Sequence, residues 1–317
     1  MSAASPLVYV NGQFIPACEV SVSVFDRGLL DGDGVREDVR VRDGVASFLD
    51  RHLARLERSA RVLGLDVPVS RGELVDVVRE SGRVTGVREG VLTLVLTRGS
   101  GEAGPDAQRC GRPTLALLTG PFRDSASRAA VGLAVTTSSV RRPDPDTAAL
   151  LSGGLGRVDL VLARAEAERW GADEALLLDR RGIVSESTAG AVFVVEDGRV
   201  VTTPVPWAPA TVERAVVLDL AEAEGIETER RALTLHDVRS ADEVFLAGTS
   251  VGVVPVRVVD GRPFGRGRTG PMALHLAEAF DEAAVEDGVP LDVGDAPAGT
   301  SASGPHRVDT SPSLERP

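Results

Sequence analysis

Hydrophobic residues follow two kinds of spacing along the first 120 residues of the chain. Residues 34–45 alternate apolar and polar positions, and this spacing is typical of a strand with one buried face. Residues 50–63 repeat apolar side chains every three or four positions, which predicts one face of an amphipathic helix. In this half of the chain we predict a hairpin over residues 8–15, strands over residues 34–45, 91–96 and 113–118, helices over residues 50–63 and 71–81, and a flexible Gly-rich loop over residues 98–111.

The strand pattern breaks at Gly120-Pro121-Phe122, and a second series of elements follows. We therefore predict two domains, an N-terminal α/β domain over residues 1–120 and a C-terminal domain over residues 121–286. Residues 287–317 are rich in Gly, Pro, Ser and Asp and have little to bury, so a disordered tail is predicted there. In the second domain the predicted strands are residues 132–137, 174–178, 182–185, 192–195 and 244–247, and the predicted helices are residues 158–170, 212–224 and 271–284.

The composition narrows the class of protein and of partner. The chain has 317 residues, of which 43% are hydrophobic, so it is long enough for two domains with cores. Its formal net charge of −12 disfavours nucleic acid as a partner, because phosphate binding needs clustered cations. No run reaches the ~20 apolar residues of a membrane span, and the N-terminus lacks the pattern of a signal peptide, so we expect a cytoplasmic protein. Cys18 and Cys110 fall in no metal-ligand spacing, so neither a disulfide framework nor a metal site is predicted.

Several motifs carry a resemblance to one enzyme family. Residues 26–37, DRGLLDGDGVRE, and residues 52–56, HLARL, resemble the N-terminal signature of class IV aminotransferases and aminodeoxychorismate lyases. This resemblance implies an α+β, two-domain fold-type IV structure like that of D-amino-acid and branched-chain aminotransferases, with a small-molecule ligand in the cleft between the domains and a homodimer. The resemblance continues in family order over residues 171–179, 184–187, 241–250 and 254–256, and residues 155–162 lean toward the lyase branch, which carries a similar Leu-Asn-Arg-Leu-Glu stretch.

The family binds pyridoxal phosphate (PLP) between its domains, and the resemblance assigns contacts to that cofactor. Arg55 matches the arginine that binds the phosphate, and a guanidinium is a good bidentate phosphate donor. Glu186 matches the glutamate that keeps the pyridine nitrogen protonated. The turn Thr249-Ser250 is preserved, and its backbone amides could hold an anion. The alternatives are a surface ion pair for Arg55 and a turn position between two strands for Glu186.

The chain contains no lysine, and its 35 Lys and Arg residues are all arginine. A GC-rich codon bias accounts for missing surface lysines, but such bias does not normally remove an amine that forms a covalent bond. By the resemblance, the Schiff-base lysine of the family falls on Gly153. Arg157 is no substitute, because a guanidinium with a pKa above ~12 does not form an imine. We therefore expect no covalent cofactor, and we assign no catalytic residue.

Other positions also depart from the family pattern. Glu213 stands where the family usually has an arginine, at the start of a predicted helix, and its carboxylate would repel a phosphate. Asp31 and Arg36 occupy aromatic positions, and Asp38 stands where the family has a hydroxyl residue. The family's Gly-Ile-Thr segment, which surrounds the phosphate, corresponds to Ala210-Thr211-Val212, and its asparagine corresponds to Ala191. The candidate ligand-binding residues are Arg55, Glu186, Thr249, Ser250, Arg157, Asp31 and Arg36.

Three functions remain open at this point. The first is a lysine-less family member that has left catalysis or serves PLP-independent chemistry or small-molecule binding. The second is an active aminodeoxychorismate lyase or amino-acid aminotransferase that holds PLP or pyridoxamine phosphate (PMP) noncovalently. The third is a dimeric binding or scaffold protein, which would expose apolar area at the N-terminal sheet. Under the first function, one set of polar residues would line the cleft and act as acid, base and anion clamp, or would form a structural salt-bridge cluster instead. This set is Asp31, Asp33, Arg36, Asp38, Arg157 and Glu186.

Overall fold

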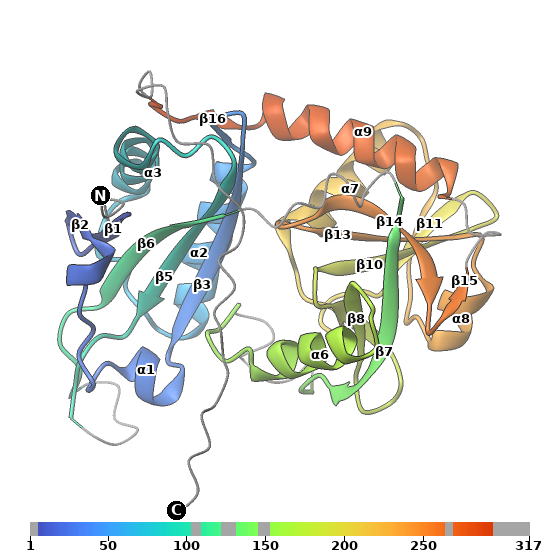
Figure 1. Ribbon diagram of the computed structural model, residues 1–317, viewed down its shortest axis with the longest axis horizontal. Helices are drawn as coiled ribbons and strands as arrows, with labels where there is room; N and C mark the ends of the chain where they lie inside the picture. Colours follow the sequence, from blue (N-terminus) through green and yellow to red (C-terminus); the bar gives the residue numbers. More distant parts are fainter. Residues whose placement is uncertain (1–5, 103–108, 122–130, 145–152, 264–268, 294–317) are drawn as a thin grey trace, which may run out of the picture.

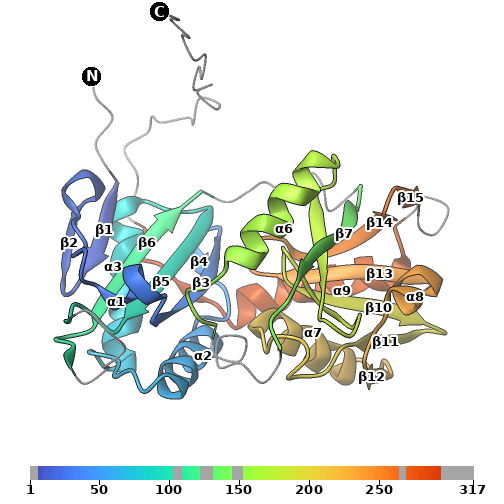
Figure 2. The ribbon, with the colours of Figure 1, turned by 90° about the horizontal axis from the view of Figure 1, so that it is seen from below.

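The computed structural model describes residues 6–102, 109–121, 131–144, 153–263 and 269–293. These residues form two lobes, each built around one β-sheet with helices packed on it (Figure 1, Figure 2). Strands up to Gly120 belong to the first sheet, and the strands between Leu133 and Pro263 form the second. Two segments therefore fold as separate sheets, in the order that the break in the sequence pattern predicts.

The N-terminal lobe contains an antiparallel sheet of seven strands in the order β16-β4-β3-β5-β6-β1-β2. Tight turns at Asp43-Gly44 and Asn11-Gly12 connect its hairpins, and all four residues have positive φ, as such turns require. The strands are β1 (Leu7–Val10), β2 (Gln13–Pro16), β3 (Gly34–Arg42), β4 (Val45–Ala46), β5 (Gly90–Thr97), β6 (Thr114–Gly120) and β16 (Val289–Pro290), and the helices are the 3₁₀ turn Ala17–Glu19, α1 (Arg27–Asp31), α2 (Leu49–Val62) and α3 (Arg71–Thr85).

Helix α2 packs on this sheet through the apolar stripe that the sequence spacing predicts. Leu49, Leu53, Leu56 and Ala60 are buried on one face of the helix and join the core of the first lobe. His52 lies on the same buried face, one turn before Leu56. The helix therefore brings the imidazole of His52, and Arg55 on the next turn, to the edge of the core that faces the second lobe.

The C-terminal lobe is built on a mixed sheet in the order β12-β11-β10-β13-β14-β7-β8-β9, with β15 paired to β14. Helices α7 and α9 pack on β10 and β13 around Phe193, Phe245 and Phe280, and α6 packs on β8. Its strands are β7 (Leu133–Arg141), β8 (Glu174–Leu178), β9 (Val184–Ser187), β10 (Ala191–Glu196), β11 (Arg199–Thr202), β12 (Thr228–Arg230), β13 (Glu243–Gly248), β14 (Gly252–Val259) and β15 (Arg262–Pro263), and its helices are α6 (Val158–Arg169), α7 (Val212–Ala223), α8 (Leu235–Ser240) and α9 (Pro271–Glu286).

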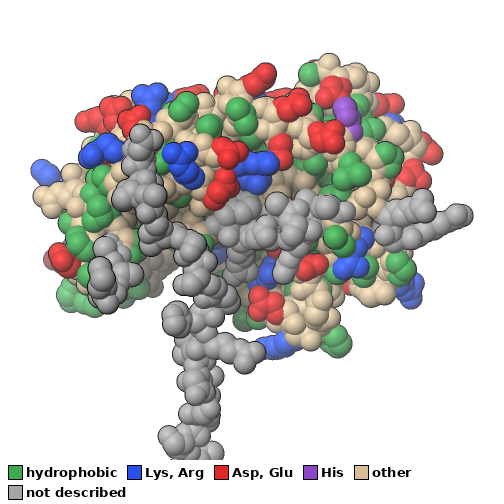
Figure 3. Space-filling model, turned by 45° about the horizontal axis from the view of Figure 1, so that its top comes forward, with side chains coloured by type: hydrophobic (Ala, Val, Ile, Leu, Met, Phe, Trp, Pro, Cys, Tyr) green, Lys and Arg blue, Asp and Glu red, His purple; other side chains and the backbone are tan. Residues whose placement is uncertain are grey.

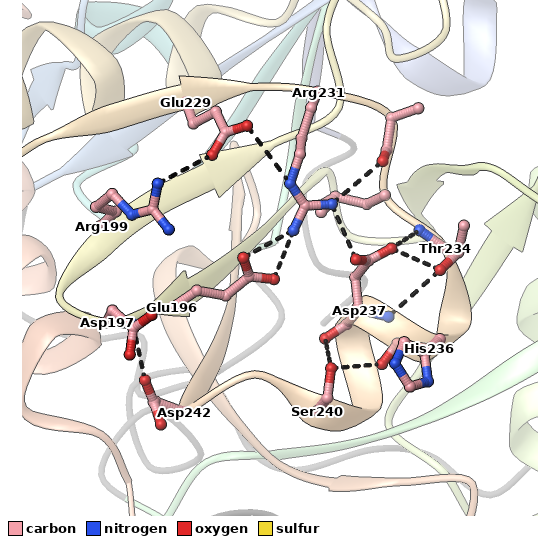
Figure 4. A network of polar contacts seen from close by, with 12 residues as sticks. Glu196, Asp197, Arg199, Glu229, Arg231, Thr234, His236, Asp237, Ser240 and Asp242 are labelled. Atoms are coloured by element: carbon pink, nitrogen blue, oxygen red, sulfur yellow. Dashed lines mark hydrogen bonds and ion pairs between the residues drawn. The ribbon is translucent and has the colours of Figure 1, made fainter.

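A polar network around Arg231 closes the far edge of the second sheet (Figure 4). The Arg231 guanidinium donates to both carboxylate oxygens of Glu196 at 2.7 Å and to Asp237 at 2.9 Å. Asp237 also completes a capping box with Thr234 at the start of α8. This network joins the end of β10 to α8 and is satisfied within itself, so it serves the fold.

The surface carries charged side chains of both signs. On the face drawn in Figure 3, acidic and basic side chains lie close to one another, with hydrophobic side chains scattered between them. Arg51 illustrates such pairing, because its guanidinium contacts Asp219 at 2.6 Å and Asp287 at 3.1 Å. Exposed pairs of this kind contribute little to stability, at most about 1 kcal/mol each.

The end of the described chain differs from the predicted tail. Residues 287–293 return to the first lobe, where β16 pairs with β4 and Leu291 is buried against Gly82 of α3. The tail boundary predicted at residue 287 is therefore wrong, because β16 pairs with β4 and Val289, Leu291 and Val293 pack against the core of the first lobe. Residues 294–317 lie outside the described residues, as does much of the predicted loop 98–111. Among the helices of the described residues, none is both long and apolar enough to cross a membrane.

Candidate functional site

A cavity of about 120 Å³ lies between the two lobes. Its walls come from β3 and α2 of the first lobe, and from the start of α6, the end of β9 and the start of α7 in the second. A larger cavity of about 700 Å³ borders it, shares Arg36, Asp38 and Arg157, and adds Ser250. The residues that the sequence predicts for ligand binding or for the cleft and that line at least one cavity are Arg36, Asp38, Arg55, Arg157, Glu186, Thr249 and Ser250.

Arg55 lines the smaller cavity and contacts both lobes. Its Nη1 lies 2.6 Å from a carboxylate oxygen of Glu37 on β3, and its Nε donates to the backbone carbonyl of Ala210, 2.8 Å away, just before α7. Glu37 is buried, and its second oxygen lies 2.7 Å from Nδ1 of His52. Arg55 is thus in an ion pair, as the alternative interpretation has it, but a buried one at the cavity rather than one on the surface.

Glu213 brings a second carboxylate to the same region. It lies in the first turn of α7, is 5% exposed, and accepts a hydrogen bond from the hydroxyl of Thr249. Its carboxylate also lies 3.9 Å from Nε2 of His52. Two buried carboxylates, from Glu37 and Glu213, therefore flank one imidazole and one guanidinium.

Glu186 is buried on the opposite wall beside Arg142. Its Oε1 lies 2.7 Å from the Nε of Arg142, although neither atom has a hydrogen-bond partner of good geometry among the described residues. Arg142 also contacts Asp159 on α6. Burial raises the pKa of the Glu186 carboxyl above its ordinary value, and the nearby Arg142 and Arg157 oppose that rise only in part.

Gly153 lies beside Arg55 in a backbone conformation that favours glycine. Its φ is +58°, in the left-handed region, and its carbonyl accepts a hydrogen bond from the backbone N–H of Arg36. A Cβ built on Gly153 would come within 3.1 Å of the Arg55 guanidinium. The position that the resemblance assigns to the lysine therefore does face the cavity, but it is occupied by a residue with no side chain.

Arg36, Asp38 and Arg157 form a charged cluster at the mouth. Asp38 accepts from Arg36 at 3.0 and 3.1 Å and from the hydroxyl of Thr93 at 2.7 Å. Arg157 approaches the same carboxylate only to 3.6 Å, beyond hydrogen-bond distance. The side chains of Arg36 and Arg157 are 41% and 45% exposed, so two guanidinium groups share one carboxylate at an open surface.

Two of the predicted cleft residues point elsewhere. Asp31 is not among the residues lining either cavity and pairs with Arg27 at 2.7 Å, one turn away in α1. Asp33 pairs with Arg98, just after β5, at 2.5 and 3.0 Å. Both side chains therefore form structural salt bridges, which was the alternative to a role in ligand binding.

Three residues of the site are not assigned to it by the sequence motifs. Glu37 falls in the buried phase of β3, together with Val35 and Val39, and this charged residue at an apolar position is a usable signal. His52 similarly falls in the apolar stripe of α2, a spacing that predicts a packing role but not its contact with Glu37. Arg142 carries no such signal, because it follows a strand in an open segment. Among the described residues, no cluster of His, Cys, Asp and Glu could hold a metal ion.

Comparison with known proteins identifies the family. The sequence model for Amino-transferase class IV matches residues 34–259. This chain belongs to the class IV aminotransferase family. It is 39% identical over 283 residues to a putative branched-chain-amino-acid aminotransferase of Methanocaldococcus jannaschii, covering 89% of this chain and 98% of the relative, and 31% identical over 287 residues to the D-alanine aminotransferase of Bacillus licheniformis, covering 88% and 98%.

Solved structures of similar proteins confirm the α+β, fold-type IV architecture. The T.th. branched-chain amino acid aminotransferase with pyridoxamine 5'-phosphate superposes with a TM-score of 0.83 at 29% identity, covering 90% of this chain and 95% of that one. The same enzyme complexed with N-(5'-phosphopyridoxyl)-L-glutamate also gives a TM-score of 0.83, at 30% identity and the same coverage. The relatives named here are aminotransferases, and the lean of residues 155–162 toward the lyase branch stays a prediction.

The residues present fit only part of a PLP site. Glu186 is a buried carboxylate facing the cavity and suits a protonated ring nitrogen. Arg55, by contrast, is already engaged by Glu37 and Ala210, and Glu213 adds a second buried carboxylate to the same cavity, 3.9 Å from His52. Gly153 offers no amine. The site therefore does not fit a phosphorylated cofactor linked to the chain by a Schiff base.

The buried Glu186 predicts a specific pH dependence of stability. Its folded-state pKa is raised, so the unfolded chain ionises first as pH rises above about 4.3, and folding loses stability until pH passes the folded pKa. We expect the unfolding free energy of wild type, minus that of Glu186→Gln, to fall as pH rises from about 4 to about 8, as measured by urea denaturation. A difference that stays flat, like that expected for the exposed Glu222→Gln, would contradict the assignment.

Proposed function

We propose that this family member binds a small carboxylate ligand, of the amino-acid or 2-oxo-acid class, in the cleft without a Schiff base to the chain. The observation that carries this proposal is Gly153, which faces the cavity at the expected lysine position in a chain without lysine. Imine formation and proton transfer at the α carbon both use a primary amine in this family, and an arginine cannot supply one at neutral pH. The chain's own residues are thus suited to binding and orienting a ligand rather than to covalent attachment.

The cluster at the mouth supports a carboxylate as the recognised group. Arg36 and Arg157 contribute two positive charges against the single carboxylate of Asp38. Because Arg157 is 3.6 Å from Asp38, its donors are open to a better-placed carboxylate from a ligand. The larger cavity of about 700 Å³ leaves room for an aliphatic side chain beside this cluster.

A second candidate function is an aminotransferase that holds PLP or PMP noncovalently. The similarity to named aminotransferases over nearly their full length favours it, as does the solved relative with pyridoxamine 5'-phosphate. Glu186 is the residue that would hold the ring nitrogen, and the bound cofactor would supply an electron sink. The carboxylates of Glu37 and Glu213 count against the phosphate in this function.

Reduction with borohydride tests whether the chain forms an imine. We expect wild-type protein mixed with PLP and then reduced to keep its unmodified mass in the folded region, because no lysine amine is present. Peptide mass spectrometry separates any adduct on the N-terminal amine from one in the cleft. A stoichiometric adduct on a cleft residue would refute the proposal, whereas retention of PLP without an adduct would favour the second candidate and call for a transamination assay with PMP and a 2-oxo acid.

Replacement of the two arginines tests carboxylate recognition. We expect Arg36→Gln and Arg157→Gln together to weaken binding of 4-methylvaleric acid, a ligand found with the T.th. relative, by about tenfold or more. Isothermal titration calorimetry gives the dissociation constants. The exposed Arg180→Gln is the matched control and should bind as wild type does. If the double variant and the control bound 4-methylvaleric acid with equal affinity, Arg36 and Arg157 would not be the residues that bind the carboxylate.

We also propose that the protein is a homodimer. Exposed apolar side chains gather before β3, where Val24, Phe25 and Leu29 are 58–66% exposed, and on α6, where Val158 and Val161 are 69% and 65% exposed. Both elements lie toward the lower edge of the molecule in Figure 1. The area before β3 lies on the N-terminal lobe, where the scaffold alternative also requires a partner surface, and the area on α6 lies on the C-terminal lobe. A second copy of the chain would cover both.

Light scattering on a sizing column tests the dimer. We expect wild type to have twice the mass of the chain, and Phe25→Ser with Leu29→Ser to shift it toward the monomer, because both substitutions remove apolar contact area. Val62→Ser, which is similarly exposed but lies on α2, should leave the mass unchanged. A wild-type monomer would refute this proposal.

A further inference from the structure

The first turn of α7 carries a buried carboxylate that lines the cavity. Unpaired N–H groups and the helix dipole attract negative charge to such a terminus. Here Glu213, the second residue of the helix, is buried with its carboxylate in contact with the hydroxyl of Thr249. The position that would suit a ligand's phosphate already carries a fixed negative charge.

The guanidinium that contacts the backbone just before this helix is also committed. Arg55 uses Nη1 for Glu37 at 2.6 Å and Nε for the carbonyl of Ala210 at 2.8 Å. His52 stands between the two carboxylates, 2.7 Å from Glu37 and 3.9 Å from Glu213. In formal charges, two carboxylates face one guanidinium and one imidazole, so the subsite has no surplus of positive charge for an added dianion.

The surrounding burial makes this balance matter. Glu37, His52 and Glu213 are each 5% exposed or less, so water screens their charges poorly. A phosphate entering here would either approach an uncompensated carboxylate or separate Arg55 from Glu37, leaving a buried charge unpaired. On the opposite wall, Glu186 lines the cavity beside Arg142 and is the carboxylate that a ligand's protonated nitrogen would meet.

We infer that this cleft selects ligands without a phosphate, so that among pyridine ligands it takes pyridoxamine in preference to pyridoxamine 5'-phosphate. The solved relative with pyridoxamine 5'-phosphate has the same fold, so the preference would arise from this chain's side chains rather than from its architecture. The inference rests on the proposed function in one respect, that the cleft binds small ligands. It goes beyond it by naming the charge that the ligand lacks and the residue, Glu213, that excludes it.

Calorimetric titration of wild-type protein with the two compounds tests the inference directly. We expect the dissociation constant of pyridoxamine to be lower than that of pyridoxamine 5'-phosphate by about tenfold or more. Inorganic phosphate should not compete with pyridoxamine, because Glu213 holds the anion position. Equal or tighter binding of the phosphorylated compound, or competition by phosphate, would overturn the inference. Both measurements use the wild-type protein alone.

Two variants assign the effect to Glu213. Glu213→Gln keeps the shape of the side chain and removes its charge, so we expect the preference for pyridoxamine to narrow by about tenfold, chiefly through tighter binding of the phosphorylated compound. Glu222→Gln, an exposed residue of the same helix, should leave the preference unchanged. A preference that does not respond to Glu213→Gln would overturn the role of that residue.

The outcomes separate this inference from the proposed function. Tight binding of 4-methylvaleric acid together with tight binding of pyridoxamine 5'-phosphate would overturn the inference alone. Failure of 4-methylvaleric acid, pyridoxamine and pyridoxamine 5'-phosphate to bind would overturn both.

Discussion

The ion pair between Arg55 and Glu37 is the interaction on which the cleft depends. Arg55 comes from α2 of the first lobe and also donates to the backbone before α7 of the second, so this one guanidinium contacts both lobes. A buried ion pair stabilises a structure only when its remaining donors and acceptors are satisfied. Here His52 takes the second oxygen of Glu37, and Ala210 takes the Nε of Arg55. The cleft is therefore stabilised by its own charges, without a need for an outside anion.

The absence of the lysine is more than a truncated side chain. Gly153 has a φ of +58°, a region that costs an L-residue with a Cβ roughly 1–2 kcal/mol. A side chain there would also press on Arg55, whose guanidinium lies 3.1 Å from the ideal Cβ position. A side chain at this position therefore requires the Arg55 guanidinium to move slightly.

Regular periodicity explains which parts of the fold were predictable from the sequence. The stripe of α2 and the alternation of β3 each mark one buried face, whereas β14 is buried on both faces, reads as a continuous apolar run and was not predicted as a strand. In the site, the roles that the resemblance gives to Arg55 and Glu186 stay predictions, and no pattern shows that Arg142 meets Glu186, because the two residues are far apart in the chain. Asp31 was misjudged since a motif gives a position and not a direction, and its carboxylate turns back to the preceding turn of α1.

The inner end and the mouth of the cleft differ in charge. At the inner end, the buried carboxylates of Glu37 and Glu213 flank His52, and Arg55 is already paired with Glu37. At the mouth, Arg36 and Arg157 stand together over the single carboxylate of Asp38, so positive charge is in excess there. Arg157 also acts on Glu186 through space and favours its charged form. A ligand's anion is thus drawn to the mouth, and its cationic or neutral end is directed inward, which reverses the polarity that a phosphate at the inner end would require.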